Sequence, residues 1–163
     1  MLNIRRAALS DIGAITEIYN EAILTTTATF DLEPKTLEDR REWFEEHDDR
    51  HPILVAELGT QVVGWTCLTR WNPRAAYENT AETSFYVKEE HRGKGIGRKL
   101  KQAIISEARQ LGFYALIAGA AQGSDASLHL NKSLGFEVAG TFREVGWKFG
   151  KLLDVIYLQK LLN

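Results

Sequence analysis

Apolar residues recur along the chain in two different periods, and these periods divide it into predicted helices and strands. A spacing of three to four residues indicates an amphipathic helix, whereas alternation or a short apolar run indicates a strand. Helical spacing is clear behind Ser10, the expected N-cap of the first helix, and Thr36 with Asp39 forms a capping-box pattern ahead of the second. The predicted helices cover residues 10–24, 36–45, 97–111 and 125–134.

Strand-like runs fill most of the chain between these helices. Residues 59–60 join two such runs as a predicted hairpin, and residues 149–151 join the last two. The segment 70–79 is rich in large side chains and is expected to form an irregular loop. The predicted strands cover residues 2–7, 52–58, 61–69, 80–88, 113–120, 137–147 and 152–161.

The order of these elements bounds the fold class. Strands and helices follow one another as β-α-α-β-β-β-α-β-α-β-β, which predicts an α+β (mixed α/β) fold around one sheet and not a regular βαβ array. A chain of 163 residues suits one domain, so we expect residues 1–163 to form a single domain. The net charge of −2 gives no reason to expect a nucleic-acid partner.

No apolar run approaches the ~20 residues of a membrane span. No membrane partner is therefore expected, and because the first residues lack the apolar region of a signal peptide, we expect a cytoplasmic protein. Cys67, the single cysteine, is predicted to pack in the core. The histidines show no metal-site spacing, so we interpret them as surface or loop residues and expect no metal. They are His47, His51, His91 and His129.

The segment from Phe85 to Gly97 carries the chemical signal. A strand leads into a glycine-rich turn and a helix follows at once, an arrangement in which backbone N–H groups bind anions. Basic residues crowd the start of this helix, where they oppose the helix dipole unless a polyanion is bound. They are Arg92, Lys94, Arg98, Lys99 and Lys101. The alternative is a plain glycine turn with a solvated basic face.

Two nucleotide-binding motifs do not fit this turn. A Walker loop requires Ser or Thr after Gly93-Lys94, where the chain has Gly95, and the third glycine of a dinucleotide fingerprint would fall on Arg98. The remaining pattern of Arg92, Gly95 and Gly97 resembles the pyrophosphate loop of the GNAT superfamily of N-acetyltransferases. Several other runs are similar to its phosphinothricin and methionine sulfone or sulfoximine acetyltransferases. These runs are 18–20, 28–30, 33–34, 80–82 and 146–148, with Gly150 and 154–155.

The resemblance implies the GNAT fold, with a mixed, mostly antiparallel sheet, and acetyl-CoA as co-substrate. The amide of Val87 would polarise the thioester carbonyl, residues 93–98 would hold the pyrophosphate, and an amine would attack directly without an acyl-enzyme. A homodimer is also implied. The cofactor-binding residues implied by the family are Phe85, Tyr86, Val87, Arg92, Gly93, Lys94, Gly95, Ile96, Gly97, Arg98, Ser124, Ser127 and Asn131.

Glu82 matches the proposed base of the family. A free Glu has a pKa of about 4.3, so a base role requires burial or a water relay; the alternative is that Glu82 only pairs with the substrate ammonium. The acceptor would be a small amino acid of the phosphinothricin or methionine sulfone type, although ordinary loop packing also explains Trp71 and Tyr77. The implied acceptor residues are Phe30, Trp71, Arg74, Tyr77 and Glu82.

The chain departs from the family at two positions after the fifth strand. Ser124 stands where the family has Asn, and Asn131 stands where it has Tyr or His. An amide cannot act as a general acid, so solvent would have to protonate the departing thiolate. Ser127 and Asn131 share a helical face and could still line the cofactor. Two other functions stay open: an N-acetyltransferase for proteins or peptides, and a non-catalytic CoA-binding module.

Overall fold

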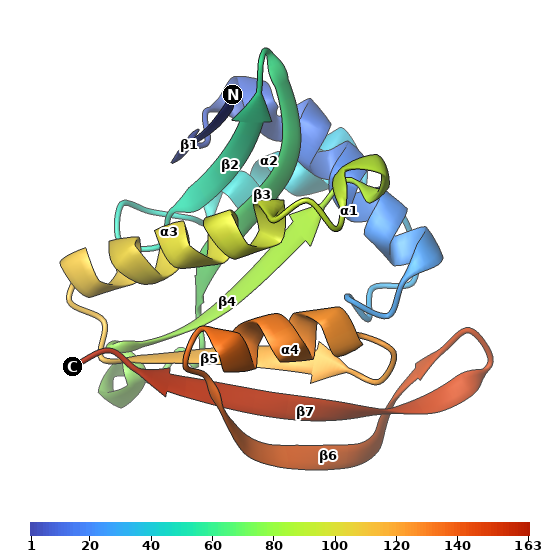
Figure 1. Cartoon of the computed structure of the whole chain (residues 1–163), viewed down its shortest axis with the longest axis vertical. Helices are drawn as coiled ribbons and strands as arrows, with labels where there is room; N and C mark the ends of the chain where they lie inside the picture. The colour runs from blue at the N-terminus through green and yellow to red at the C-terminus, as the bar shows by residue number, and fades with distance from the viewer.

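One seven-stranded sheet organises the chain in a computed structural model that describes residues 1–163. The strands are β1 (Leu2–Arg6), β2 (Ile53–Leu58), β3 (Gln61–Arg70), β4 (Thr80–Val87), β5 (Ala115–Ala121), β6 (Glu137–Lys148) and β7 (Lys151–Leu161). The α-helices are α1 (Ile12–Thr25), α2 (Leu37–Glu45), α3 (Ile96–Gln110) and α4 (Asp125–Ser133). The strand order is β1-β2-β3-β4-β5-β7-β6, and every pair is antiparallel except β4 and β5 (Figure 1).

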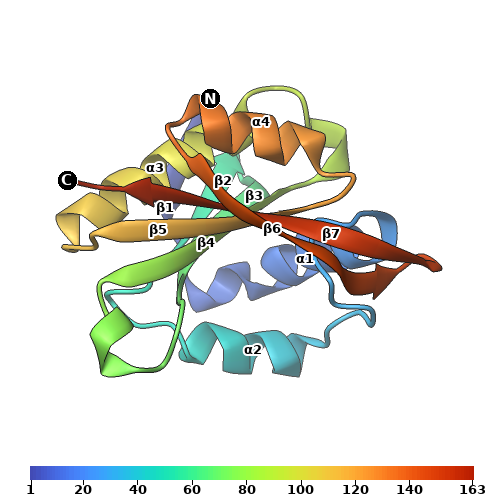
Figure 2. The same ribbon diagram turned by 90° about the horizontal axis from the view of Figure 1, so that it is seen from below.

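Two helical layers cover the two faces of the sheet. Helices α1 and α2 lie on one face, and α3 and α4 lie on the other (Figure 2). Because successive side chains of a strand point to opposite faces, Val55 packs with α1 while its neighbour Leu54 packs beneath α3. The predicted mixed α/β class, its single mostly antiparallel sheet and the predicted order of elements are confirmed. No helix combines the length and the apolar character that crossing a membrane requires.

Capping and turn residues predicted most helix and strand boundaries correctly, but the prediction that Ser10 is the N-cap of the first helix is wrong. The capping box of Thr36 and Asp39 is present at the start of α2. At α1, however, Asp11 is the N-cap, and its carboxylate accepts a hydrogen bond from the backbone N–H of Ala8 at 2.7 Å. The same carboxylate pairs with Arg5 of β1 at 2.8 Å. No side chain caps the start of α1, because a 3₁₀ turn at Leu9–Asp11 leads directly into the helix and the Asp11 carboxylate binds Ala8 and Arg5 instead.

Cys67 is predicted in the core, and the histidines are predicted on the surface or in loops. Cys67 is buried, as predicted, and burial raises the pKa of its thiol to about 11. His51 lies in the loop before β2, as predicted, but it is not a surface residue, since it is 6% exposed. Its ring packs against Phe113, and its Nδ1 lies 2.8 Å from a carboxylate oxygen of Asp48. No group of three or more His, Cys, Asp or Glu residues is placed to hold a metal ion.

The parallel pair β4 and β5 separates partway along its length. Their pairing covers only Thr80–Glu82 against Ala115–Ile117. Beyond that point β4 continues beside β3, whereas β5 continues beside β7, so the two strands diverge (Figure 1). This divergence opens the sheet in its middle and exposes one edge of β4.

Candidate active site

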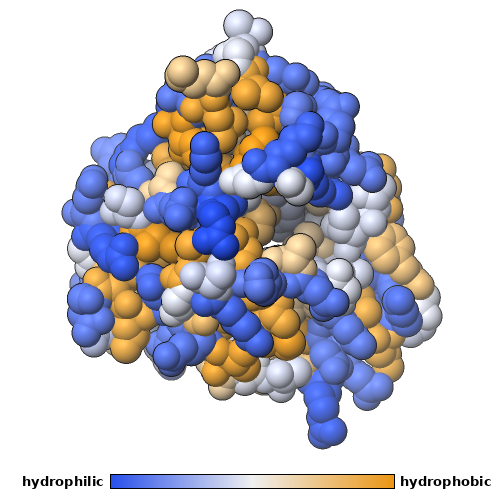
Figure 3. Space-filling model, viewed as in Figure 1, coloured by the Kyte–Doolittle hydropathy of each residue, from blue (hydrophilic) through white to orange (hydrophobic).

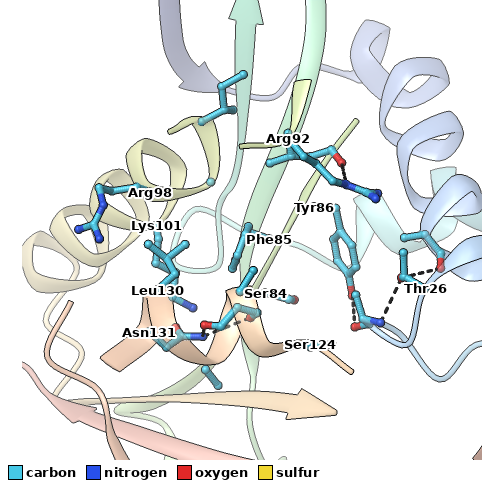
Figure 4. Close-up of a pocket in the computed structure, with 18 of the residues that line it drawn as sticks. Thr26, Ser84, Phe85, Tyr86, Arg92, Arg98, Lys101, Ser124, Leu130 and Asn131 are labelled. Carbon is cyan, nitrogen blue, oxygen red and sulfur yellow. Dashed lines mark hydrogen bonds between the residues drawn. The ribbon is translucent and has the colours of Figure 1, made fainter. Parts of the chain in front are cut away.

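A cavity of about 440 Å³ fills the opening between β4 and β5. Its walls come from β4, the glycine-rich loop, α3, α4, the end of α1 and the middle of β5. The face shown in Figure 3 is hollowed near its centre, where these elements surround the free edge of β4. Figure 4 shows the side chains of this cavity, with Arg92 and Asn131 far apart across it.

The free edge of β4 presents backbone groups to this cavity. The N–H of Lys88 donates to Val63 of β3 at 2.8 Å. Alternation along the strand therefore turns the N–H groups of Phe85 and Val87 away from β3 and toward the opening. The carbonyl of Val87 is already occupied, because Nε of Arg92 donates to it at 2.9 Å. From the sequence, only the amide of Val87 was expected to face the thioester. The strand geometry points the amide of Phe85 in the same direction.

The loop that follows ends in an open anion site. Gly93 and Gly95 adopt positive φ values of 74° and 83°, which side chains rarely tolerate. Gly95 is the N-cap of α3, and no side chain caps that end. The first-turn N–H groups of an uncapped helix lack intrahelical partners and attract anions. The loop is anchored on α1, where the Glu21 carboxylate accepts the N–H of Glu89 at 2.7 Å.

All predicted cofactor residues except the exposed Lys94 line this cavity. The structure adds wall residues that sequence analysis missed, several of them small. The two on α1 and β5, Ala22 and Ala118, carried no local signal, because only the divergence of β4 and β5 brings those elements to the loop. The missed residues are Ala22, Thr26, Ala28, Thr83, Ser84, His91, Lys101, Ala118, Gly123, Ala126 and Leu130.

Lys101 requires a correction. Sequence analysis grouped it with the basic residues around the helix start, but it is 1% exposed and lies within the molecule. Its Nζ is 4.8 Å from the ring centroid of Phe136 and 5.8 Å from that of Phe85. Burial lowers the pKa of Lys101 to about 7, and the charge of Glu82 opposes this shift. A lysine at a position shared with Ile104 and Ile105 on the buried face was the missed signal.

Asn131 is as deeply buried as Lys101 and only partly satisfied. Its Nδ2 donates to the carbonyl of Ser127 at 3.0 Å, so the predicted pair shares one face of α4. Its Oδ1 is buried without a hydrogen-bond partner, as is Oγ1 of Thr83. Both residues line the cavity. Unpartnered buried acceptors are rare in folded proteins and commonly mark a binding or catalytic site.

A second cavity, of about 480 Å³, lies beside Glu82 and Trp71 and is bounded by β5, β6 and β7. Glu82 and Thr83 are neighbours on β4 and therefore point to opposite faces of the sheet. Since Thr83 lines the first cavity and Glu82 the second, the two cavities approach each other across the point where β4 and β5 part. Burial raises the pKa of Glu82, and the charge of Lys101 opposes this shift.

The structure brings together only some of the predicted acceptor residues. Trp71 and Glu82 share the second cavity, and the ring of Tyr77 packs on Trp71 with centroids 5.1 Å apart. Phe30 packs instead against Gly146, where a Cβ would clash with its ring. Arg74 lines neither of these cavities.

Comparison with known proteins places this site in context. The profile described as "Acetyltransferase (GNAT) family" matches residues 15–136. A curated L-methionine sulfoximine/L-methionine sulfone acetyltransferase from Pseudomonas paraeruginosa is 38% identical over 163 residues, which is 99% of this chain and 95% of that protein.

Two solved structures are similar over almost the whole chain. A phosphinothricin acetyltransferase of the GNAT superfamily from Sinorhizobium meliloti, in complex with AcCoA, has a TM-score of 0.96 and 32% identity, covering 99% of this chain and 89% of that one. A ribosomal-protein-alanine N-acetyltransferase from Brucella melitensis has a TM-score of 0.95 and 41% identity, covering 98% and 99%.

Proposed function

Because this chain belongs to the GNAT family of acetyltransferases, we propose that it transfers the acetyl group of acetyl-CoA directly to the amino group of a small amino-acid-like acceptor. The observation that carries this proposal is that two cavities are lined by adjacent residues, Thr83 and Glu82, at the point where β4 and β5 part. A donor thioester in one cavity and an amine in the other would meet there. Proximity of this kind replaces a covalent enzyme intermediate.

The first cavity suits the donor. Amides of residues 93–98 would hold the diphosphate at the start of α3, and the free edge of β4 would bind the pantetheine arm. The N–H groups of Val87 and Phe85 then point at the thioester, where one of them would stabilise the oxyanion. Ser124, Ser127 and Asn131 would contact the arm from α4.

The second cavity suits the acceptor. Trp71 and Tyr77 would form its aromatic wall, and Glu82 would accept the proton that the attacking ammonium must lose. Its raised pKa suits this role better than the pKa of a free Glu. Arg74 and Phe30 do not line the second cavity, and their segments would have to move toward it before they could contact the acceptor. Their assignment to acceptor binding therefore rests on the family resemblance.

Glu82→Gln tests the base role. We expect kcat to fall by about 10²–10⁴-fold, because the amine then lacks a proton acceptor, while the Kd for acetyl-CoA stays unchanged. Thiol release measures kcat and calorimetry measures Kd. The matched control is Glu42→Gln on α2, which is exposed and outside both cavities. Unchanged turnover in Glu82→Gln would leave Glu82 as no more than a partner of the substrate ammonium.

The acceptor is resolved by a panel. Methionine sulfone, methionine sulfoximine and phosphinothricin are the expected substrates, and peptides with an N-terminal alanine are the competing class suggested by the Brucella protein. Higher kcat/KM on the peptides would replace the small-acceptor proposal. Tight acetyl-CoA binding with no thiol release on any acceptor would favour a non-catalytic CoA-binding module.

We further propose that residues 1–163 form one domain and that it assembles as a homodimer. All seven strands belong to one sheet, which supports a single domain. Exposed apolar side chains gather on β6 and β7, and such patches commonly mark interfaces. They include Phe142, Val145, Trp147, Phe149 and Leu152. We place the protein in the cytoplasm, a reducing compartment compatible with the unpaired Cys67.

A further inference from the structure

We infer that Lys101, together with Asn131, protonates the departing CoA thiolate, so that a buried lysine takes the place of the Tyr or His that the family resemblance leads one to expect at position 131. This inference rests on the proposed acetyl transfer. It assigns a catalytic role to a residue of α3 that the pyrophosphate loop does not include.

The first support is the position of the lysine. Lys101 is 1% exposed, yet it lines the donor cavity from α3. It forms no salt bridge, and aromatic rings flank its ammonium, with Nζ 4.8 Å from the Phe136 centroid. A buried ammonium without a carboxylate partner lowers the stability of the fold. A ligand in the cavity would offer a partner to its N–H groups.

The second support is the orphaned acceptor of Asn131. Its Nδ2 is fixed by the carbonyl of Ser127, which prevents the amide from turning over and leaves Oδ1 unpaired. Figure 4 shows Lys101 and Asn131 reaching into the same end of the cavity from α3 and α4. An amide oxygen accepts but cannot donate a proton. Asn131 therefore offers an unpaired acceptor at the cavity that Lys101 also lines, and of the two only Lys101 can supply the proton.

The proton transfer balances with the acetyl transfer. The amine nitrogen forms a bond to the thioester carbon, the C–S bond breaks, and its electron pair remains on sulfur. One proton then passes from Nζ of Lys101 to that sulfur, which leaves CoA thiol and a neutral lysine. Glu82 holds the proton removed from the amine, and return of a proton to Lys101 through solvent restores both groups.

The acidity of Lys101 suits this step. Its pKa of about 7 lies below the ~8.5 of a free thiol, so the transfer to sulfur runs downhill. The ionisable groups that face it are Glu82 from β4, whose carboxylate favours the charged form of Lys101, and Cys67 from β3, whose thiol stays neutral because burial raises its pKa to about 11. Asn131 from α4 and the Phe136 ring carry no charge. An ordinary lysine, with a pKa near 10.4, would hold its proton against the thiolate.

Lys101→Met tests the inference in a single-turnover assay of acetyl transfer across pH. In the wild type, the rate should fall above pH ~7 as the ammonium loses its proton. In Lys101→Met this alkaline limb should vanish, and the rate at pH 6.5 should drop by about 100-fold or more. Methylammonium should restore the rate of Lys101→Ala in proportion to its concentration. Lys132→Met, exposed on α4 and outside the cavity, is the matched control.

Further measurements separate acid catalysis from other roles. Calorimetry should give the same Kd for acetyl-CoA in wild type and Lys101→Met. Lys101→Arg keeps a charge but holds its proton, so its rate should stay low, and full activity in this variant would overturn the inference. An unchanged pH profile in Lys101→Met, or acetylation of Lys101 detected by mass spectrometry, would also overturn it. A wild type that releases no thiol would instead contradict the proposed function itself.

Discussion

Two ionisable side chains on neighbouring elements set the chemistry at the scale of single residues. Burial moves their pKa values toward each other, upward for Glu82 and downward to about 7 for Lys101. Each charge limits the shift of the other, although no salt bridge joins them. Groups whose pKa values are shifted by burial and by a neighbouring charge are candidates for acid and base work. Their proximity also means that substitution of one should move the titration of the other.

Lys101→Met should stabilise the fold, in contrast to its effect on activity. In the unfolded chain Lys101 titrates near pH 10.5, and in the folded chain near 7. Below pH 7 both states carry the charge, and the full penalty of burying it applies. The penalty shrinks as pH rises from 7 to 10.5. Urea unfolding at pH 6.5 should therefore favour the variant by a few kcal/mol, on the order of 1.4 kcal/mol for each pKa unit. An equal gain at pH 6.5 and pH 10 would contradict this assignment.

At the scale of elements, the start of α3 is fitted closely against β4. A Cβ on Gly97 would lie 2.9 Å from Cε2 of Phe85, so only glycine permits this approach. The close fit places the first-turn N–H groups of α3 beside the free edge of β4. Arg98 then holds α3 to α4 through a 2.7 Å hydrogen bond from its Nη2 to Ser133. The cavity therefore depends on helix placement as much as on the loop residues.

Gly97→Ala should weaken both the packing and the donor site. Displacing the Phe85 ring should cost about 1–3 kcal/mol of unfolding free energy. Shifting the helix start should raise the Kd for acetyl-CoA by about tenfold, which corresponds to ~1.4 kcal/mol. Urea unfolding and calorimetry measure the two effects. Gly13→Ala in α1 is the control, because nothing lies within 4 Å of its added Cβ, and it should leave the Kd unchanged. An unaltered Kd in Gly97→Ala would show that the position of the helix start does not determine the affinity for acetyl-CoA.

At the scale of the whole molecule, the end of the sheet formed by β7 and β6 exposes large apolar side chains to solvent. Strand β6 forms an edge of the sheet, and its exposed residues include Phe142 and Trp147. Phe142 also lines the second cavity, so a partner seated on this surface would border the acceptor site. Long, apolar edge strands generally require a cover, and a second copy of the chain would supply one.

Trp147→Glu should therefore convert the proposed homodimer into monomers. Trp147 is 61% exposed, so a charge there is tolerated in a monomer but would be desolvated in an interface. Sedimentation at several concentrations measures the change. Tyr114→Glu places the same charge at another exposed aromatic residue and should leave the mass unchanged. A wild type that sediments as a monomer at all concentrations would refute the dimer.

The sequence determined the features that depend on neighbouring residues. Hairpin turns, the capping box of Thr36, the glycine-rich loop and the order of elements all follow from residues a few positions apart, and the structure has them as predicted. The cofactor residues of β4, the glycine-rich loop and the start of α3 could be predicted because they lie on one continuous segment. Phe85 and Gly97 come to the cavity together because a single strand, loop and helix carry them.

Tertiary structure alone decided which groups face one another across the sheet. The divergence of β4 from β5 makes the cavities, and it depends on β7 and β3, which lie far away along the chain. The start of α1 lies at Asp11 and not at Ser10, because a 3₁₀ turn precedes the helix and the Asp11 carboxylate pairs with Arg5 of β1. Lys101 resembled its basic neighbours in sequence, but burial against Phe136 and Phe85 changes its pKa and its chemistry. Burial and electrostatic fields sum over distant residues, so no local pattern contains them.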